Sequence, residues 1–209
     1  DLHIAYRRQR QMCIRDSSYT VALSRNNTFT NPIFPLGGSE FVLSARFSLP
    51  YSLWNGVDYG SLGELPEFQD SNGDPDQSKI DQEKYKWLEF YKIKFKGSWY
   101  TRIFDKLVLR THAEFGFLGA YNNDRGVIPF DRFFLGGDGM SQYAMDGREM
   151  ISMRGYPNQS LSSQNGSTIY NKFSLELRYP ITLKPAASIF GLTFIESGQG
   201  FDKFRDYNP

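Results

Sequence analysis

The sequence predicts an all-β protein, part of an antiparallel transmembrane β-barrel, and three observations support this. Apolar and polar residues alternate along several runs of strand length, as expected of β-strands with two different faces. The connections between these runs are alternately short and long. No run of consecutive apolar residues is long enough to form a transmembrane helix.

Composition narrows the class of protein further. The 19 Gly and 10 Pro residues argue against a helical protein, because both residue types interrupt helices. Aromatic residues make up 16% of the chain, which is unusually rich. The net charge of +1 gives no indication of the clustered basic face that binds nucleic acid, so we expect no nucleic-acid partner.

Six runs are predicted to be consecutive strands, at residues 19–28, 40–49, 88–104, 107–117, 171–179 and 186–197. Their lengths suit tilted strands that cross a membrane. We expect strands that are neighbours in sequence to pair, because hairpin connections make that the simplest topology. The apolar residues predicted to point outward toward lipid are Phe41, Leu43, Phe47, Leu107, Leu109, Phe115, Phe173, Leu175 and Leu177.

The connections favour a barrel over a soluble β-sandwich, which would show the same alternation. Short links are predicted at residues 31–38, 105–106 and 180–185, whereas residues 50–85 and 120–169 form long connections. Outer-membrane barrels have this asymmetry, with short periplasmic turns and long outer loops. Six strands are too few to close such a barrel, so we expect a fragment of a larger one.

Residues 1–17 are predicted not to belong to the barrel domain, which we place at residues 18–209. This segment shows no strand period and contains the only cysteine, Cys13. It resembles a translated sequencing-adapter tail, and it lacks the apolar core that a targeting peptide would need.

The sequence gives little support for a catalytic or metal site. His112 is the only histidine after residue 17, and we expect it to be a hydrogen-bonded residue of the polar face rather than a general base. Residues 70–76 superficially resemble a calcium loop, but Pro75 stands where the pattern needs glycine. We therefore expect a protein that is not an enzyme and has no cofactor or metal.

Three lysines, Lys92, Lys94 and Lys96, follow one face of a predicted strand. They could form an anion-selective ring, as in a porin. We favour a hydrated wall in which these charges pair with neighbouring strands.

Three motifs, taken together on this strand pattern, carry a resemblance to a known family. They are the link NPIFPLGG at residues 31–38, the sequence RFFLGG at 132–137 followed by MRGY at 153–156, and FIESG at 194–198. In order and spacing they resemble motifs of the outer-membrane protein assembly factor (BamA) family, within the bacterial surface-antigen superfamily. Tyr156 stands where this family more often has phenylalanine.

The resemblance implies a barrel of sixteen strands in the bacterial outer membrane, preceded by periplasmic domains, that inserts other barrel proteins. The implied partners are unfolded outer-membrane proteins, periplasmic chaperones, accessory lipoproteins and the lipid bilayer. The stretch at about 120–168 would be an outer loop that folds back into the lumen. A secretion transporter of the same superfamily and a passive diffusion porin are the alternatives.

The resemblance also implies a set of site residues on this loop and the strands beneath it. The loop tip is Arg154, Gly155 and Tyr156, and the Phe-x-Gly-Gly element is Phe134, Gly136 and Gly137. A guanidinium in a confined lumen needs a carboxylate partner, because an unpaired buried charge is costly. Family correspondence implies Glu196 as that partner, with Glu176 as the fallback. The alternative is an exposed arginine without a fixed contact.

One feature of the last predicted strand leaves two arrangements open. Glu196 has the same parity as Phe190, Leu192 and Phe194. Either these three apolar residues also face the lumen, or a β-bulge precedes Glu196.

Overall fold

The computed structural model of the protein describes residues 17–28, 34–138, 148–184 and 187–203. The described residues belong to two compact units. Among the described residues, one unit comprises 17–20, 46–91 and 119–128, and the other comprises 21–28, 34–45, 92–118, 129–138, 148–184 and 187–203. The predicted tail at residues 1–17 lies almost entirely outside the described residues.

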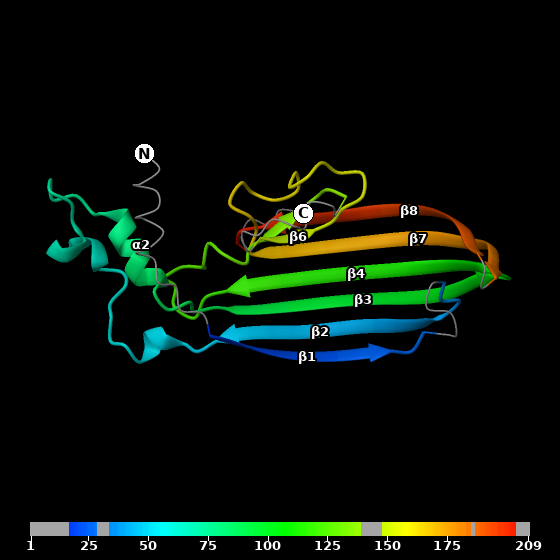
Figure 1. The fold of residues 1–209 in the computed structure, drawn as a ribbon, viewed down its shortest axis with the longest axis horizontal. Helices are drawn as coiled ribbons and strands as arrows, with labels where there is room; N and C mark the ends of the chain where they lie inside the picture. Colours follow the sequence, from blue (N-terminus) through cyan, green and yellow to red (C-terminus); the bar gives the residue numbers. More distant parts are fainter. Residues whose placement is uncertain (1–16, 29–33, 139–147, 185–186, 204–209) are drawn as a thin grey trace. The chain divides into compact units, whose positions relative to one another are not determined.

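One antiparallel sheet contains six strands in the order β1-β2-β3-β4-β7-β8 (Figure 1). Their bounds are Ser18–Asn26, Gly38–Ser48, Tyr91–Phe104, Leu107–Gly119, Ile169–Lys184 and Ala187–Phe201. β4 pairs antiparallel with β7, and β7 pairs antiparallel with β8. Every strand therefore lies beside its neighbour in the predicted series, and β1 and β8 form the two edges.

The turn between β3 and β4 lies at Asp105 and Lys106, as the sequence predicts. Asp105 has a φ of 43°, in the left-handed region. Aspartate tolerates this conformation better than most residues, because its short side chain can bond to nearby backbone. The predicted link at residues 31–38 is described only from Phe34 onward.

The predicted link at residues 180–185 is wrong, because β7 continues through Pro180 to Lys184. Proline has no N–H group to donate to a neighbouring strand, which normally ends a central strand. Here the register with β8 shifts between Pro180 and Thr182, and such a bulge accommodates the missing donor. Residues 185–186, between β7 and β8, lie outside the described residues.

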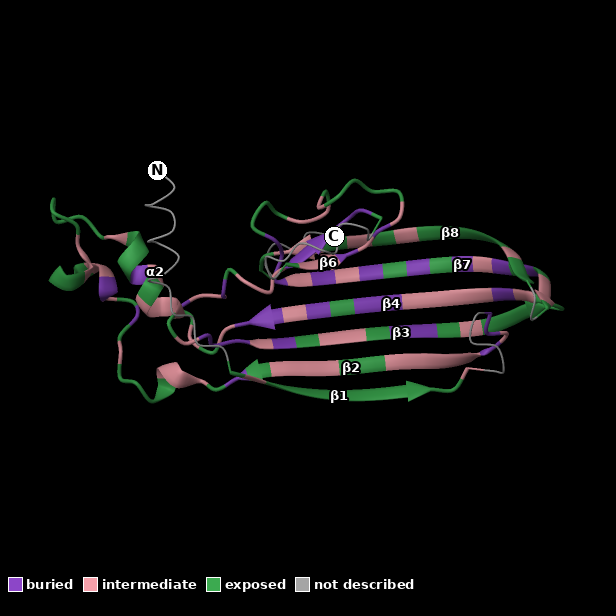
Figure 2. Ribbon diagram, in the orientation of Figure 1, coloured by how far each residue is buried: buried purple, intermediate pink, exposed green. Residues whose placement is uncertain are grey.

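The sheet has an apolar face that is exposed and a polar face that is largely covered. Along β7, Phe173 and Leu175 are each 47% exposed, whereas Lys172 and Glu176 are 8% and 5% exposed (Figure 2). Of the nine residues predicted to point toward lipid, five are exposed: Leu43, Phe47, Phe115, Phe173 and Leu175. Phe41, Leu107, Leu109 and Leu177 are half-buried. Soluble proteins bury apolar side chains and expose charged ones, whereas this sheet does the reverse. That arrangement is expected of a surface that faces lipid.

The long connection before β7 supplies the cover on the polar face. Residues 129–168 belong to the same unit as most of the sheet, whereas residues 119–128 belong to the other unit. Within this loop, β5 (Phe133–Leu135) and β6 (Glu149–Ile151) form a short parallel pair. The Phe133 ring lies 4.6 Å from the ring of Tyr170 on β7, centroid to centroid. The loop therefore has a small core of its own against the sheet.

The connection at residues 50–85, expected to be a loop, contains helical structure. It forms three short 3-10 helices, Tyr51–Leu53, Leu62–Glu64 and Pro66–Phe68, and the α-helix α2 at Gln77–Tyr85. Tyr59, Leu62 and Ile80 form its buried core. Within the described residues, no helix is both long enough and apolar enough to cross a membrane.

The helix begins where it does because Asp76 caps it. The Asp76 carboxylate accepts bonds from the backbone N–H groups of Ser78 and Lys79, which have no partner inside the helix. Asp70, in the calcium-like stretch, likewise accepts from the N–H groups of Asn72 and Asp74. These aspartates therefore stabilise turns and a helix end.

We expect the Asp76→Ala substitution to destabilise α2 by about 1 kcal/mol, the typical effect of losing an N-cap. Hydrogen exchange of the α2 amides should then accelerate by about fivefold, which corresponds to that free energy. Gln82→Ala, at an exposed position in the same helix, is the matched control and should leave exchange unchanged. Equal acceleration by both substitutions would show that the cap is not responsible.

Candidate functional site

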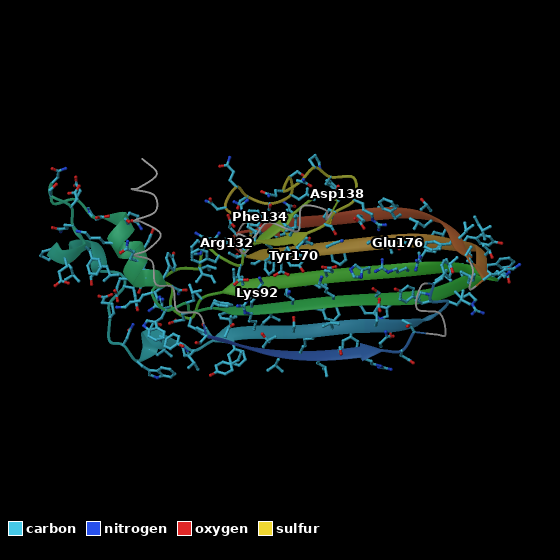
Figure 3. The ribbon with its side chains drawn as sticks, viewed as in Figure 1. Lys92, Arg132, Phe134, Asp138, Tyr170 and Glu176 are labelled. Atoms are coloured by element: carbon cyan, nitrogen blue, oxygen red, sulfur yellow. The ribbon has the colours of Figure 1, made fainter. Side chains whose placement is uncertain are left out.

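The candidate functional site is the contact between the loop at residues 129–168 and the polar face of the sheet (Figure 3). Backbone bonds fix the loop at both ends. Phe133 and Ser167 exchange two N–H to carbonyl bonds of 2.9 and 2.7 Å, and Leu118 donates to Thr168 over 2.7 Å. Gly200 on β8 donates to Leu161 over 3.0 Å. The loop is thus part of the sheet's hydrogen-bonding pattern, and its side chains are held over the polar face.

Arg154 at the loop tip contacts both carboxylates that were considered as partners. Its Nε donates to Glu196 Oε1 over 2.8 Å, and its backbone N–H donates to Glu196 Oε2 over 2.8 Å. One terminal guanidinium nitrogen lies 2.5 Å from Glu196 Oε1 and 2.5 Å from Glu176 Oε1. Both carboxylates are buried, with side chains 4% and 6% exposed. The structure therefore gives Arg154 fixed partners on two adjacent strands.

A second arginine balances the charge of this cluster. Arg110 on β4 lies 3.3 Å from Glu176, which pairs with Arg110 in the register of β4 and β7. Arg178 lies 3.9 Å from the other oxygen of Glu176, so three guanidinium groups face two buried carboxylates, and the Arg154 side chain itself is 37% exposed. Burial alone would lower the pKa of Arg154, but its bonds to Glu196 and Glu176 outweigh burial and raise that pKa. Arg154 therefore remains charged in the docked loop.

The register of β8 resolves the two arrangements that the sequence left open. Glu196 lies opposite Ser174, and Phe194 lies opposite Glu176, without a register shift between them. Phe194 and Leu192 therefore share the polar face with Glu196, and no register shift lies between Phe190 and Glu196. The Arg154 guanidinium lies 3.8 Å from the centroid of the Phe194 ring, and Arg178 lies 5.0 Å from that of Phe190. Stacking against cations explains why aromatic rings occupy a polar face.

The Phe-x-Gly-Gly element supports the loop tip from below. Gly136 and Gly137 have φ values of 114° and 96°, which residues with a side chain rarely adopt. A Cβ on Gly136 would lie 2.3 Å from the Pro157 carbonyl oxygen, so the backbone approach itself requires glycine. Gly137 donates to the carbonyl of Tyr156 over 3.0 Å, which ties this element directly to the tip.

The remaining motif residues complete this arrangement. Phe134 is buried, and the Arg148 guanidinium lies 5.0 Å from the centroid of its ring. Gly155 has a φ of 86°, and Tyr156 is 38% exposed. All six predicted loop residues therefore lie in one connected structure, with Glu196 and Glu176 beneath its tip.

A second ionic contact holds the loop at β6, and the sequence did not predict it. Glu149 lies 2.6 Å from Lys92 and 2.8 Å from Lys94, both on β3. Lys92, whose side chain is 3% exposed, also donates to the Asp131 carbonyl over 2.7 Å. The interpretation that these lysines pair with neighbouring strands is therefore wrong for Lys92 and Lys94. It holds for Lys96, which lies 3.3 Å from Glu114 on β4.

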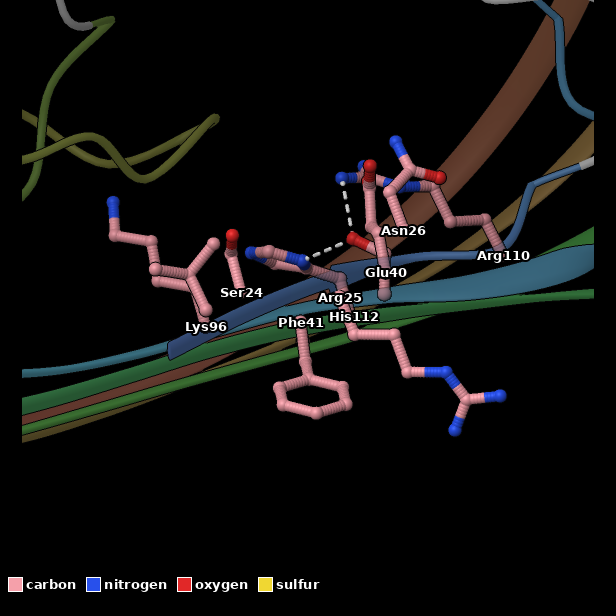
Figure 4. A pocket seen from close by; sticks show the side chains of 11 residues that line it. Ser24, Arg25, Asn26, Glu40, Phe41, Lys96, Arg110 and His112 are labelled. Carbon is pink, nitrogen blue, oxygen red and sulfur yellow. Dashed lines mark hydrogen bonds between the residues drawn. The ribbon is translucent and has the colours of Figure 1, made fainter. Parts of the chain in front are cut away.

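His112 bridges two strands of the same face through both ring nitrogens. Ser98 Oγ lies 2.8 Å from Nδ1, and Glu114 Oε1 lies 2.9 Å from Nε2. Arg110 donates to Ser98 over 3.3 Å, so the serine is held from two sides. Figure 4 labels Arg110 and His112 in this pocket. His112 is therefore a hydrogen-bonded residue of the polar face, as predicted. Together with Ser98 and Arg110 it lines a pocket of about 430 Å³.

The described fold and site together define a class of protein. A sheet that exposes apolar side chains on one face and binds its own loop on the charged face is a wall segment of an outer-membrane-type β-barrel. Residues 16–206 match the model of the Omp85 superfamily domain, and the chain belongs to the Omp85 superfamily.

A solved structure supports the same fold. The chain is similar to the crystal structure of BamA from Haemophilus ducreyi lacking POTRA domains 1-3, with a TM-score of 0.58 and 18% sequence identity. The match covers 90% of this chain but only 30% of that chain. The protein is thus similar to about a third of that structure, which places it in the barrel. Comparison with curated proteins gave no match.

Proposed function

We propose that this barrel segment belongs to an assembly factor that folds and inserts other β-barrel proteins into the bacterial outer membrane. The observation that carries the proposal is the loop fixed to the polar face by Arg154, Glu196 and Glu176. A barrel whose loop is fixed in this way has the polar inner face of its wall covered. Its function would then be mechanical rather than enzymatic. Superfamily membership and the BamA-like fold support this choice.

The ionic contacts disfavour a passive diffusion porin. An anion-selective pore would need cations facing an open lumen, but Lys92 and Lys94 are paired with the loop carboxylate of Glu149. The loop therefore lies where ions would pass and also neutralises the charges that would select them. A secretion transporter of the same superfamily would share this docked loop.

The proposed partners follow from the two faces of the sheet. Its exposed apolar side chains fit the acyl chains of a bilayer, which would place the protein in the outer membrane. The substrates would be unfolded outer-membrane proteins delivered by periplasmic chaperones, and accessory lipoproteins would complete the assembly complex.

The test is to reconstitute the full-length protein in liposomes and add a urea-unfolded eight-stranded barrel protein. We expect folding, followed by the electrophoretic shift of heat-modifiable barrels, to proceed at least tenfold faster than in empty liposomes. Conductance should be low and irregular because the loop fills the lumen. Steady, large conductance without faster folding would contradict the proposal and support a porin. Delivery of one dedicated partner into the vesicles, without barrel folding, would instead support a transporter.

A further inference from the structure

The unit that contains α2 has a pocket lined with aromatic rings. The pocket holds about 330 Å³ and is lined in part by Tyr51, Trp54, Tyr59 and Trp87. The Tyr51 and Trp87 rings lie 5.0 Å apart and are tilted by 38°. Trp54 is 68% exposed, which is unusual for the largest apolar side chain. Tyr59 is 5% exposed and belongs to the core of this unit, so the exposed indole of Trp54 with the half-buried rings of Tyr51 and Trp87 is the part suited to stacking with a ligand.

Polar groups of both charges stand among these rings. Glu83 and Lys86 line the same pocket and lie 3.6 Å apart, so their charges largely cancel. Asn55 adds a carboxamide, whose nitrogen donates to the Tyr59 hydroxyl over 2.5 Å and whose oxygen accepts from the Val57 backbone N–H over 3.1 Å, which leaves one N–H and one lone pair for a ligand. The pocket therefore offers both hydrogen-bond donors and acceptors but little net charge, which favours a neutral ligand over an anion or a cation.

A buried ionic network holds the pocket in shape. Glu89 and Arg125, with side chains 2% and 4% exposed, form an ion pair of 2.9 Å. Glu89 also accepts from the backbone N–H and hydroxyl of Ser52, over 2.8 and 2.7 Å. Arg125 donates to the carbonyls of Lys84 and Trp87 and lies 4.8 Å from the Tyr59 ring centroid. These bonds connect the segments that carry the rings, so the pocket exists before any ligand binds.

We propose that this pocket binds a neutral sugar ring of a glycan. A pyranose ring has C–H groups on its faces, which pack against an indole or phenol ring, and hydroxyl groups around its edge. Those hydroxyls both donate and accept, and they match Asn55, Glu83 and Lys86 together. The volume lies near the lower end of the usual range for ligand pockets, which suits one or two sugar units. Every residue used here lies outside the Arg154 site, so the inference stands or falls separately from the proposed function.

The experiment uses the chain's three tryptophans as reporters in the full-length protein, reconstituted in nanodiscs. Trp99→Phe removes the reporter on β3, and the part of the fluorescence change that Trp54→Phe abolishes in this background is the signal of the pocket. Titration with maltotriose and with triacetylchitotriose, both neutral trisaccharides, should give a saturable change in fluorescence for at least one of them. Calorimetry with the same sugar then measures binding without a fluorescent reporter.

Trp54→Ala should weaken binding measured by calorimetry at least tenfold. Leu53→Ala is the matched control, because Leu53 is 70% exposed beside Trp54 and does not line the pocket. The inference is overturned if neither trisaccharide saturates, or if both substitutions have the same effect. A third arm uses nanodiscs that contain brominated phosphatidylcholine. Strong quenching of Trp54 there would also overturn it, because the ring would then lie in the bilayer interface.

Discussion

Replacing Arg154 with alanine should detach the loop tip and abolish most assembly activity. The substitution leaves the buried carboxylates of Glu196 and Glu176 without the guanidinium that they share. Removing one partner from a buried ionic contact typically costs about 3–5 kcal/mol. The docked state should therefore lose most of its population, and folding of a client barrel in liposomes should slow at least tenfold.

Arg154→Lys should restore only part of this activity. A lysine ammonium is a single point of charge, whereas the guanidinium contacts two carboxylates on different strands and also stacks on Phe194. Hydrogen exchange at the backbone amides of Arg154 and Gly155 reports docking directly, since the Arg154 amide donates to Glu196. Arg102→Ala, at an exposed arginine of β3, is the control. If Arg154→Ala leaves both exchange and client folding at wild-type rates, the loop contact has no role.

Reversing the charge of Glu149 should have the second-largest effect. In the unsubstituted protein, Lys92 and Lys94 lie 2.6 and 2.8 Å from the Glu149 carboxylate. Glu149→Lys replaces this carboxylate with a third ammonium group. We expect docking of β6 to lose about 3 kcal/mol, the lower end of the range for a broken buried contact. Exchange of the amides at residues 149–151 should rise accordingly.

The double substitution Lys94→Glu with Glu149→Lys exchanges the two charges and provides the control. It should recover much of the lost docking, because Lys94 is partly exposed and accepts a carboxylate at low cost. Failure of the double variant to recover any docking would show that shape, rather than charge, determines this contact.

Acid should weaken the same contact over a defined range. Burial alone would raise the pKa of Glu149, but Lys92 and Lys94 outweigh burial and lower that pKa. The contribution of Glu149 to the stability of docking is therefore complete above its unfolded-state pKa of about 4.3. This contribution is lost as the pH falls through the lower pKa of the docked state. Protection of the β6 amides, measured relative to intrinsic exchange at each pH, should remain high at pH 5 and fall only below about pH 4.3. Glu149→Gln should remove this dependence, and an unchanged acid profile in that variant would assign the effect to another group.

Much of the sheet was determined by the sequence, because strand alternation is a local property. Apolar residues recur at every second position in residues 107–117 and 171–179, because only apolar side chains are stable against lipid. Each pattern can be recognised without knowledge of the partner strand. The motif glycines were also recognisable, and Gly136 and Gly137 occupy conformations that glycine adopts readily. Pro180 misled the prediction, because proline usually ends a strand and the compensating bulge depends on the register with β8.

Apart from the carboxylates implied for Arg154 by the family resemblance, the partners of the charged side chains were decided by the tertiary structure. The lysines of β3 were visible as a polar row, but the carboxylate of Glu149 is more than fifty residues away in the sequence. Likewise, the shared parity of Phe194 and Glu196 left two arrangements open, and the structure decided between them by placing the Arg154 guanidinium over the Phe194 ring. The sequence by itself therefore determined which residues form strands and which face of each is apolar, because burial in lipid acts on each strand separately. Only the folded loop decided which charges meet, because an ionic contact depends on positions in space that no local pattern records.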